Sequence, residues 1–149
     1  MKVKSEGGFL MAKIHQLSGR IFTKLLKKHK INEINPAQGR IMFVLWQTDN
    51  ISINELAKQT SLGKSTLTSM LDRLEESGYV KRIPSKDDRR KTMIQRTEKD
   101  KSFQDLYVKV SKEMHDVYLK GFTDSETRQF ETYLKRIFDN LLVYEEKIN

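Results

Sequence analysis

The chain has 149 residues and a net charge of +8 at pH 7, with 37% hydrophobic and 32% charged residues, enough for one domain with its own core. Because there is no cysteine, disulfide bonds and thiolate metal sites are excluded. The sequence has no apolar run long enough to span a membrane and no signal-peptide core, so we expect a cytoplasmic protein.

The charge is distributed unevenly along the chain. Residues 1–50 carry a net +6 and residues 51–97 a net +4, whereas residues 98–149 carry a net −2. A basic protein favours a polyanionic partner, although the same charge also suits a membrane surface. The acidic final third argues against a uniformly basic surface.

Two helices are predicted before residue 50. The first covers about residues 9–29, and its apolar residues repeat at helical spacing: Leu10, Ile14, Leu17, Ile21 and Leu25. The second begins with Asn35 as its N-cap and Pro36 at the first helical position, where proline is tolerated. Its apolar side consists of Ile41, Val44, Leu45 and the single tryptophan, Trp46.

A helix-turn-helix pattern comes next. Ser52 can cap a short helix while Glu55 reaches back to it, which makes a capping box. Small polar residues over 60–63, ending in glycine, then predict a tight turn. Another helix is expected over residues 64–77, where Gly78 stops it in the C′ position. One apolar stripe marks its buried face: Leu67, Met70, Leu71 and Leu74.

The polar face of helix 64–77 changes character along its length. Its N-terminal half carries a lysine and hydroxyl groups, namely Lys64, Ser65, Thr66, Thr68 and Ser69, whereas its C-terminal half is mostly acidic. Only the first half can approach a polyanion without repulsion, as the recognition helix of a helix-turn-helix does in a DNA major groove. The alternative is an ordinary helical hairpin with a solvated outer face.

The segment after this helix predicts a basic β-hairpin. Residues 79–83 and 92–96 contain β-formers, and turn-forming residues over 84–88 separate them. The stretch from Lys81 to Lys91 holds two acidic residues and six basic ones: Lys81, Arg82, Lys86, Arg89, Arg90 and Lys91. A charge run is usually only a solvated loop. Directly after a hydroxyl-faced helix, however, it is typical of the wing of a winged helix, whose arginines can enter a minor groove.

Two long helices complete the chain. Thr97 is expected to cap a helix that reaches about Gly121, and Thr123 and Glu126 form a capping box that opens the last helix. Both helices carry long apolar stripes, such as Phe103, Leu106, Tyr107, Val110 and Met114 in the first and Phe130, Leu134, Ile137, Phe138 and Leu141 in the second. One small winged helix would struggle to cover these faces, so part of them is expected to form a core between subunits.

Two stretches of the sequence resemble the MarR family of winged-helix transcriptional regulators. They are residues 67–80, which read LTSMLDRLEESGYV, and Asp88-Arg89-Arg90-Lys91 followed by Thr97-Glu98-Lys99. Weaker similarity extends over nearly the whole chain, including Gln38 and Leu45. The chain departs from the usual pattern in three places: Ser85-Lys86 replace Asp-Pro, Arg96 replaces an apolar residue, and Asp100 replaces a glycine.

The resemblance implies a mainly α fold with a small β-hairpin wing. Residues 1–149 would form a single domain, with the winged helix-turn-helix over residues 35–97 and dimerisation helices over residues 9–34 and 98–146. The expected function is a homodimeric regulator that binds double-stranded DNA at a palindromic operator, a repressor released by a small ligand. The alternative is a winged-helix module that binds protein through the same surface and does not bind DNA.

The resemblance and the charge pattern together select candidate site residues. The expected DNA-binding residues are Lys64, Ser65, Thr66, Thr68, Ser69, Arg73, Arg89, Arg90 and Lys91. Members of the family often bind small aromatic anions between the dimerisation helices and the winged helix, and the residues here that suit such a pocket are His15, Arg20 and Trp46. The alternative is that Trp46 belongs to the core, while His15 and Arg20 are solvated.

No metal site, cofactor or enzymatic activity is expected. The three histidines, His15, His29 and His115, lie far apart in sequence and lack nearby metal-ligand partners. The sequence contains no glycine-rich phosphate loop and no Gly-x-Ser-x-Gly elbow. Its adjacent acidic pairs point in different directions on a helix or strand, which makes them poor acid–base partners.

Overall fold

The computed structural model describes residues 4–149 and has a mainly helical fold with a small antiparallel sheet, which confirms the predicted fold class. Its elements are α1 (Gly7–Lys28), α2 (Pro36–Gln47), β1 (Ile51–Ser52), α3 (Ile53–Thr60), α4 (Lys64–Glu76), β2 (Val80–Pro84), β3 (Thr92–Arg96), α5 (Glu98–Tyr118) and α6 (Asp124–Ile148). The chain forms two compact units with a boundary between Ser111 and Lys112, so α5 begins in the first unit and ends in the second.

Helices α2 and α3 of the first unit begin at side-chain caps. At α2 the predicted Asn35 cap is confirmed: the Gln38 N–H donates to the Asn35 side chain at 2.8 Å, and the Asn35 N–H donates to the Gln38 side chain at 3.0 Å. At α3 only half of the predicted capping box forms. The Glu55 N–H donates to the Ser52 hydroxyl at 3.2 Å, but the Glu55 carboxylate accepts a hydrogen bond from Gln59 at 3.0 Å. The prediction that Glu55 reaches back was therefore wrong, because a partner one turn later occupies its carboxylate.

The turn between α3 and α4 lies where it was predicted, but Ser61 makes its left-handed step. Ser61 has φ 56° and is the C-cap of α3, whereas Gly63 has φ −64° and is the N-cap of α4. At the other end of α4, Gly78 has φ +83° directly after the C-cap Ser77, which confirms the predicted C′ glycine.

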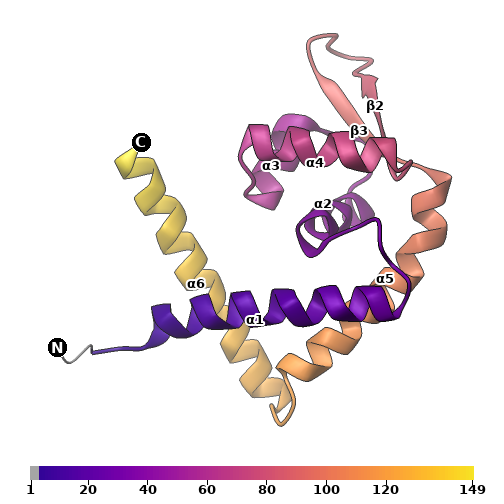
Figure 1. Ribbon diagram of the computed structural model, residues 1–149. Helices are drawn as coiled ribbons and strands as arrows, with labels where there is room; N and C mark the ends of the chain where they lie inside the picture. The colour runs from indigo at the N-terminus through magenta and orange to yellow at the C-terminus, as the bar shows by residue number, and fades with distance from the viewer. Residues whose placement is uncertain (1–3) are drawn as a thin grey trace. The chain divides into compact units, whose positions relative to one another are not determined.

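The sheet has three antiparallel strands in the order β1-β3-β2. The β2–β3 hairpin was predicted, and its register pairs Val80 with Arg96 and Pro84 with Thr92. Strand β1 was not predicted, because two residues before a helix cap carry no alternating pattern; Ile51 pairs with Ile94 on β3. The hairpin projects on the side of α4 that faces away from α2 (Figure 1).

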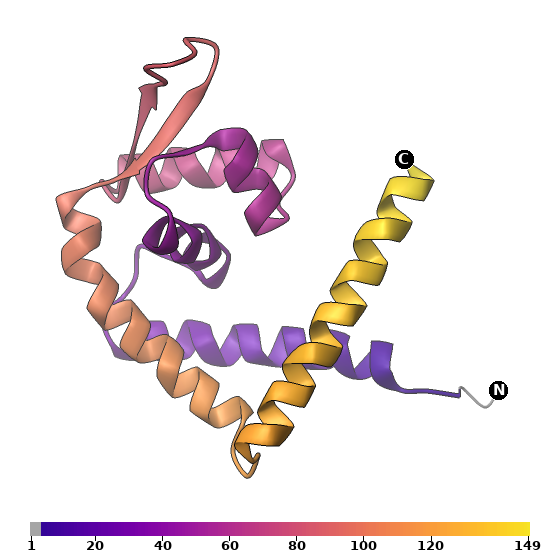
Figure 2. The same ribbon diagram turned by 180° about the vertical axis from the view of Figure 1, so that it is seen from behind.

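The core of the first unit lies where α2, α3, α4 and the sheet meet. The predicted stripe of α4 is confirmed: Leu67, Leu71 and Leu74 are fully buried, and Met70 packs partly buried against the same core. Helix α2 lies between α1 and the α3–α4 pair (Figure 2), and it contributes fully buried residues such as Ile41, Met42 and Leu45.

The first turns of α5 pack on this core through aromatic side chains. The Tyr107 ring lies 5.7 Å from the Phe22 ring, 5.3 Å from the Trp46 ring and 5.6 Å from the Phe103 ring, measured between centroids. Tyr107 also approaches the α2 backbone so closely that a Cβ atom on Gly39 would stand 1.6 Å from the tyrosine oxygen. Glycine at position 39 is what allows α2 and α5 to meet.

The second unit consists of the end of α5 and helix α6. Helix α5 ends at Tyr118, before the predicted Gly121, whose φ of +84° belongs to the connection. The predicted capping box at Thr123 and Glu126 is confirmed by reciprocal hydrogen bonds of 3.0 and 3.1 Å. No residue of α6 is buried, although the helix carries a long apolar stripe.

Candidate nucleic-acid interface

The N-terminal half of α4 presents its hydroxyl groups to solvent. Ser65, Thr66 and Ser69 are exposed, and so is Lys64 at the first helical position. Thr68 is exposed as well, but its hydroxyl donates to the Lys64 carbonyl at 2.8 Å. Because its proton is engaged, Thr68 can offer a ligand only acceptor lone pairs, whereas the exposed serines can both donate and accept.

The wing tip is a turn held by hydrogen bonds, and it carries exposed basic side chains. Its Ser85 hydroxyl accepts hydrogen bonds from the N–H groups of Asp87 and Asp88 at 3.3 Å each, and the Ser85 N–H donates to the Lys91 carbonyl at 2.9 Å. Ser85, one of the departures from the family pattern, thus fixes the turn. The three predicted wing residues Arg89, Arg90 and Lys91 are all exposed.

Arg90 is both exposed and oriented. Its side chain is 91% exposed, yet its Nε donates to the Asp88 carboxylate at 3.1 Å, and its backbone N–H donates to the same carboxylate at 3.0 Å. The Arg90 guanidinium, helped by this backbone hydrogen bond, holds the pKa of Asp88 below its usual range. The wing therefore presents one guanidinium in a preferred orientation at its tip.

Arg82 has a role that the sequence analysis did not find. Its guanidinium pairs with Asp72 at 2.7 Å and Glu75 at 3.0 Å, and also donates to the Thr68 carbonyl at 3.3 Å. This one side chain of β2 therefore pairs with two carboxylates of the acidic half of α4, offsets one of their two charges and ties the wing to the helix. The only signal in the sequence was a basic residue in a strand that follows the acidic end of a helix. That signal does not specify which carboxylates Arg82 pairs with.

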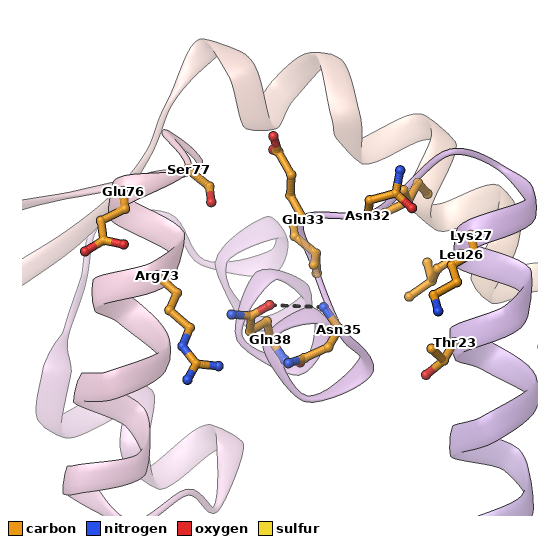
Figure 3. A pocket seen from close by; sticks show the side chains of 12 residues that line it. Thr23, Leu26, Lys27, Asn32, Glu33, Asn35, Gln38, Arg73, Glu76 and Ser77 are labelled. Atoms are coloured by element: carbon orange, nitrogen blue, oxygen red, sulfur yellow. Dashed lines mark hydrogen bonds between the residues drawn. The ribbon is translucent and has the colours of Figure 1, made fainter.

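Arg73 lies on the opposite flank of α4. Its side chain points toward Asn35 and Gln38 at the start of α2 (Figure 3), and it lines a cavity of about 460 Å³ between α1, α2 and α4. Lys27 of α1 is a second cation in the lining, and Glu33 and Glu76 are its acids. The structure thus separates Arg73 from the flank that faces the wing.

The three residues predicted for an effector pocket do not come together in this cavity. His15 and Arg20 are exposed on α1, and neither lines the cavity. Trp46 is half-buried, packs on Tyr107 and donates its indole N–H to the Asp100 carboxylate at 3.0 and 3.2 Å. The cavity itself was not predicted, because segments far apart in sequence line it.

Two further departures from the family pattern are partners of each other. Arg96, the last residue of β3, donates its Nε to the fully buried carboxylate of Asp100 in the first turn of α5, and a second guanidinium nitrogen donates to Gln104. Trp46 is the third donor group at this site. A charge at position 96 is therefore tolerated because position 100 supplies the opposite charge.

A short helix, a tight turn, a second helix with an exposed polar half and a basic hairpin define a winged helix-turn-helix protein. Comparison with known proteins then gives the family, because residues 34–92 match the MarR family profile. Residues 34–92 are thus a MarR-family segment, and transcriptional regulators of this family align with the chain.

Individual relatives agree with this assignment. The HTH-type transcriptional repressor IacR of Pseudomonas putida is 26% identical over 133 residues, which are 89% of this chain and 78% of that protein. Several other relatives align over only 40% to 65% of their own length. Among solved structures, a mutant of E. coli MarR complexed with operator DNA is 27% identical, with a TM-score of 0.78 over 87% of this chain and 91% of that one.

A further solved structure shares the fold at lower identity. It concerns regulation of DNA binding of Bordetella bronchiseptica BpsR by 6-hydroxynicotinic acid, and it matches with a TM-score of 0.83 at 17% identity over 93% of this chain and 97% of that one. The relatives are regulators of transcription and not enzymes, as the sequence analysis expected. No helix within residues 4–149 is long and apolar enough to cross a lipid bilayer.

Proposed function

We propose that this MarR-family regulator is a homodimeric repressor that binds a palindromic operator through α4 and the wing. The observation that carries the proposal is the Arg82 clamp, which pairs with Asp72 and Glu75 in the acidic half of α4 and ties β2 of the wing to that helix. A phosphate backbone that approaches this surface meets exposed basic side chains on α4 and on the wing, while Asp72 and Glu75 are already paired with Arg82.

Each exposed residue of this surface has a role that follows from its chemistry. The hydroxyls of Ser65, Thr66, Thr68 and Ser69 read base edges, Lys64 holds a phosphate, and Arg90 enters the minor groove with Arg89 and Lys91 on the flanking phosphates. Because the Thr68 hydroxyl proton is engaged, its base partner is an amino group of adenine or cytosine. Arg73, on the far flank, is assigned to a phosphate at the edge of the interface.

The dimer is supported by apolar surface in the terminal helices. Phe9, Leu10 and Ile14 on α1 are 66%, 46% and 55% exposed, and the whole stripe of α6 is exposed, including Ile137 and Leu141. Exposed apolar surface of this extent is typical of an interface between subunits. Residues 9–34 and 98–146 are therefore proposed as the dimerisation helices of a single domain over residues 1–149, around the winged helix of residues 35–97.

Release by a small aromatic anion is the second part of the proposal. The cavity beside α4 has two cations, Lys27 and Arg73, and amide groups from Asn35 and Gln38 that suit a carboxylate with polar substituents (Figure 3). A ligand releases DNA only if it binds the DNA-incompetent arrangement better than the competent one. Titration with salicylate should then lower DNA affinity by the same factor by which DNA lowers salicylate affinity.

The DNA-binding proposal is tested by titrating the protein with labelled duplexes and measuring fluorescence anisotropy. Wild-type affinity should fall steeply as salt rises, because each lysine or arginine that binds a phosphate releases a condensed cation from the DNA. Ser69→Ala should change the preference among duplexes by about 1–3 kcal/mol, because only a base contact discriminates sequence. Failure of the wild type to bind any duplex at low salt would favour the alternative, a winged-helix module that binds protein.

A further inference from the structure

Asp100 forms a closed network at the base of the wing. Its carboxylate is fully buried and accepts the Trp46 indole N–H at 3.0 and 3.2 Å, while the Arg96 Nε donates to it from the other side. The Arg96 side chain is only 13% exposed and also reaches Gln104. Within residues 4–149 no buried side-chain nitrogen or oxygen lacks a hydrogen-bond partner, which is the condition for burying a charge pair.

The network joins three elements at one point. Trp46 lies in the last turn of α2, Arg96 ends β3, and Asp100 lies in the first turn of α5. The backbone of Arg96 is held as well, since its N–H donates to the Asp49 carboxylate at 2.9 Å and its strand position pairs with Val80. The end of β3 is thus fixed by its side chain and by its backbone.

We propose that Asp100 is a positioning residue for DNA binding, which sets the direction of the wing relative to α4; this inference rests on the proposed function. The basic tip lies at the far end of the hairpin, so a small rotation at its base changes the position of Arg90 relative to α4. Hydrogen bonds between charged groups are directional, whereas an apolar contact at the same place would allow the strand to slide. Arg82 holds β2 to α4, and Asp100 holds β3 to α2 and α5.

Two variants separate the effect of Asp100 on wing position from its effect on the stability of the fold. Asp100→Asn replaces one carboxylate oxygen with an amide donor, which must face either the Arg96 or the Trp46 N–H donor, so it should weaken both the fold and DNA binding. The double variant Arg96→Leu/Asp100→Ala removes both charges, and thermal unfolding should therefore return toward the wild-type midpoint. DNA affinity of the double variant should nevertheless remain about tenfold weaker than that of the wild type, because the tether is absent.

Two further readouts are specific to the wing. In the double variant the slope of log Kd against log salt should fall by about one to two, because the displaced wing makes fewer phosphate contacts. Trp46 is the only tryptophan, so the loss of its hydrogen bond to Asp100 is visible as a change in emission wavelength. Asp105→Asn, an exposed acid on the same helix, is the matched control and should change none of these quantities.

The possible outcomes distinguish failure of the proposed DNA binding from failure of the positioning role of Asp100. Wild-type protein that binds no duplex would contradict the proposed function and this inference with it. Wild-type binding with a double variant that regains stability and stays weak on DNA supports the positioning role. Wild-type binding with a double variant whose affinity and salt slope match the wild type would overturn the positioning role alone.

Discussion

Arg90 joins two properties that minor-groove insertion requires, which are exposure and a fixed direction. Its side chain is 91% exposed, and its Nε and a second guanidinium nitrogen donate to the Asp88 carboxylate at 3.1 and 3.3 Å, which limits its orientation. We expect Arg90→Ala to weaken operator binding by roughly 1–3 kcal/mol. Thermal unfolding should change only slightly, because the ion pair with Asp88 is exposed to solvent. Anisotropy titration at moderate salt measures this, with Arg128→Ala on α6 as a control of equal charge change. Wild-type affinity in Arg90→Ala would show that the wing tip does not contact DNA.

The same contact should appear in the titration of Asp88. Its pKa is lowered in the folded protein, so the ion pair contributes stability above the unfolded pKa and loses it as pH falls through the folded value. In Arg90→Ala the pKa of Asp88 should rise toward the ordinary value for aspartate. NMR titration of the side-chain carboxyl carbon measures the shift directly. An unchanged pKa would mean that the Arg90 contact does not form in solution.

At the scale of elements, the joint between α2 and α5 depends on Gly39. A Cβ at this position would lie 1.6 Å from the Tyr107 oxygen and 2.5 Å from its ring, and Tyr107 is itself buried. Gly39→Ala should therefore destabilise the protein by ~1–3 kcal/mol through overpacking. Denaturant unfolding measures the change in free energy.

Gly19→Ala is the matched control for this prediction. A Cβ at Gly19 in α1 meets no atom within 4 Å, so the substitution should be neutral or stabilise the helix by ~0.5–1 kcal/mol. Equal unfolding midpoints for Gly39→Ala and the wild type would mean that α2 and α5 can separate enough to admit a methyl group.

Local patterns in the sequence predicted the elements, whereas contacts between distant segments were not predictable from it. The α4 stripe and the Asn35 and Thr123 caps follow from spacing within one helix, and all were found. The Arg82 clamp and the cavity depend on how the hairpin and α1 pack against α4. No periodicity encodes that packing, so the sequence analysis placed Arg82 among the wing bases only.

The departures from the family pattern at Arg96 and Asp100 also depend on a contact that the sequence alone did not predict. In the sequence, Arg96 is a charged residue at a position that is usually apolar, and Asp100 is an acidic residue at a position that is usually glycine. In the structure each is the other's partner, with Trp46 as a third. The sequence also offered Trp46 for an effector pocket, but its indole is engaged in this network.

At the scale of the whole molecule, binding to a symmetric operator requires two copies of the chain. Ile137 lies on the exposed apolar stripe of α6 and is 37% exposed, so Ile137→Glu would place a charge in the proposed interface. We expect this variant to sediment as a monomer and to lose operator binding. Lys135→Glu, on the polar side of the same helix, should remain dimeric. A folded wild-type monomer at micromolar concentration would contradict the proposed dimer.

The central claim is that two copies of α4 and the wing read one symmetric site in DNA. It is tested most directly by enriching DNA from a random-sequence pool with the purified wild-type protein and sequencing what is bound. The account predicts an inverted repeat whose half-site centres lie about one helical turn, or roughly 10 base pairs, apart. A pool without enrichment, or an enriched motif without two-fold symmetry, would contradict it.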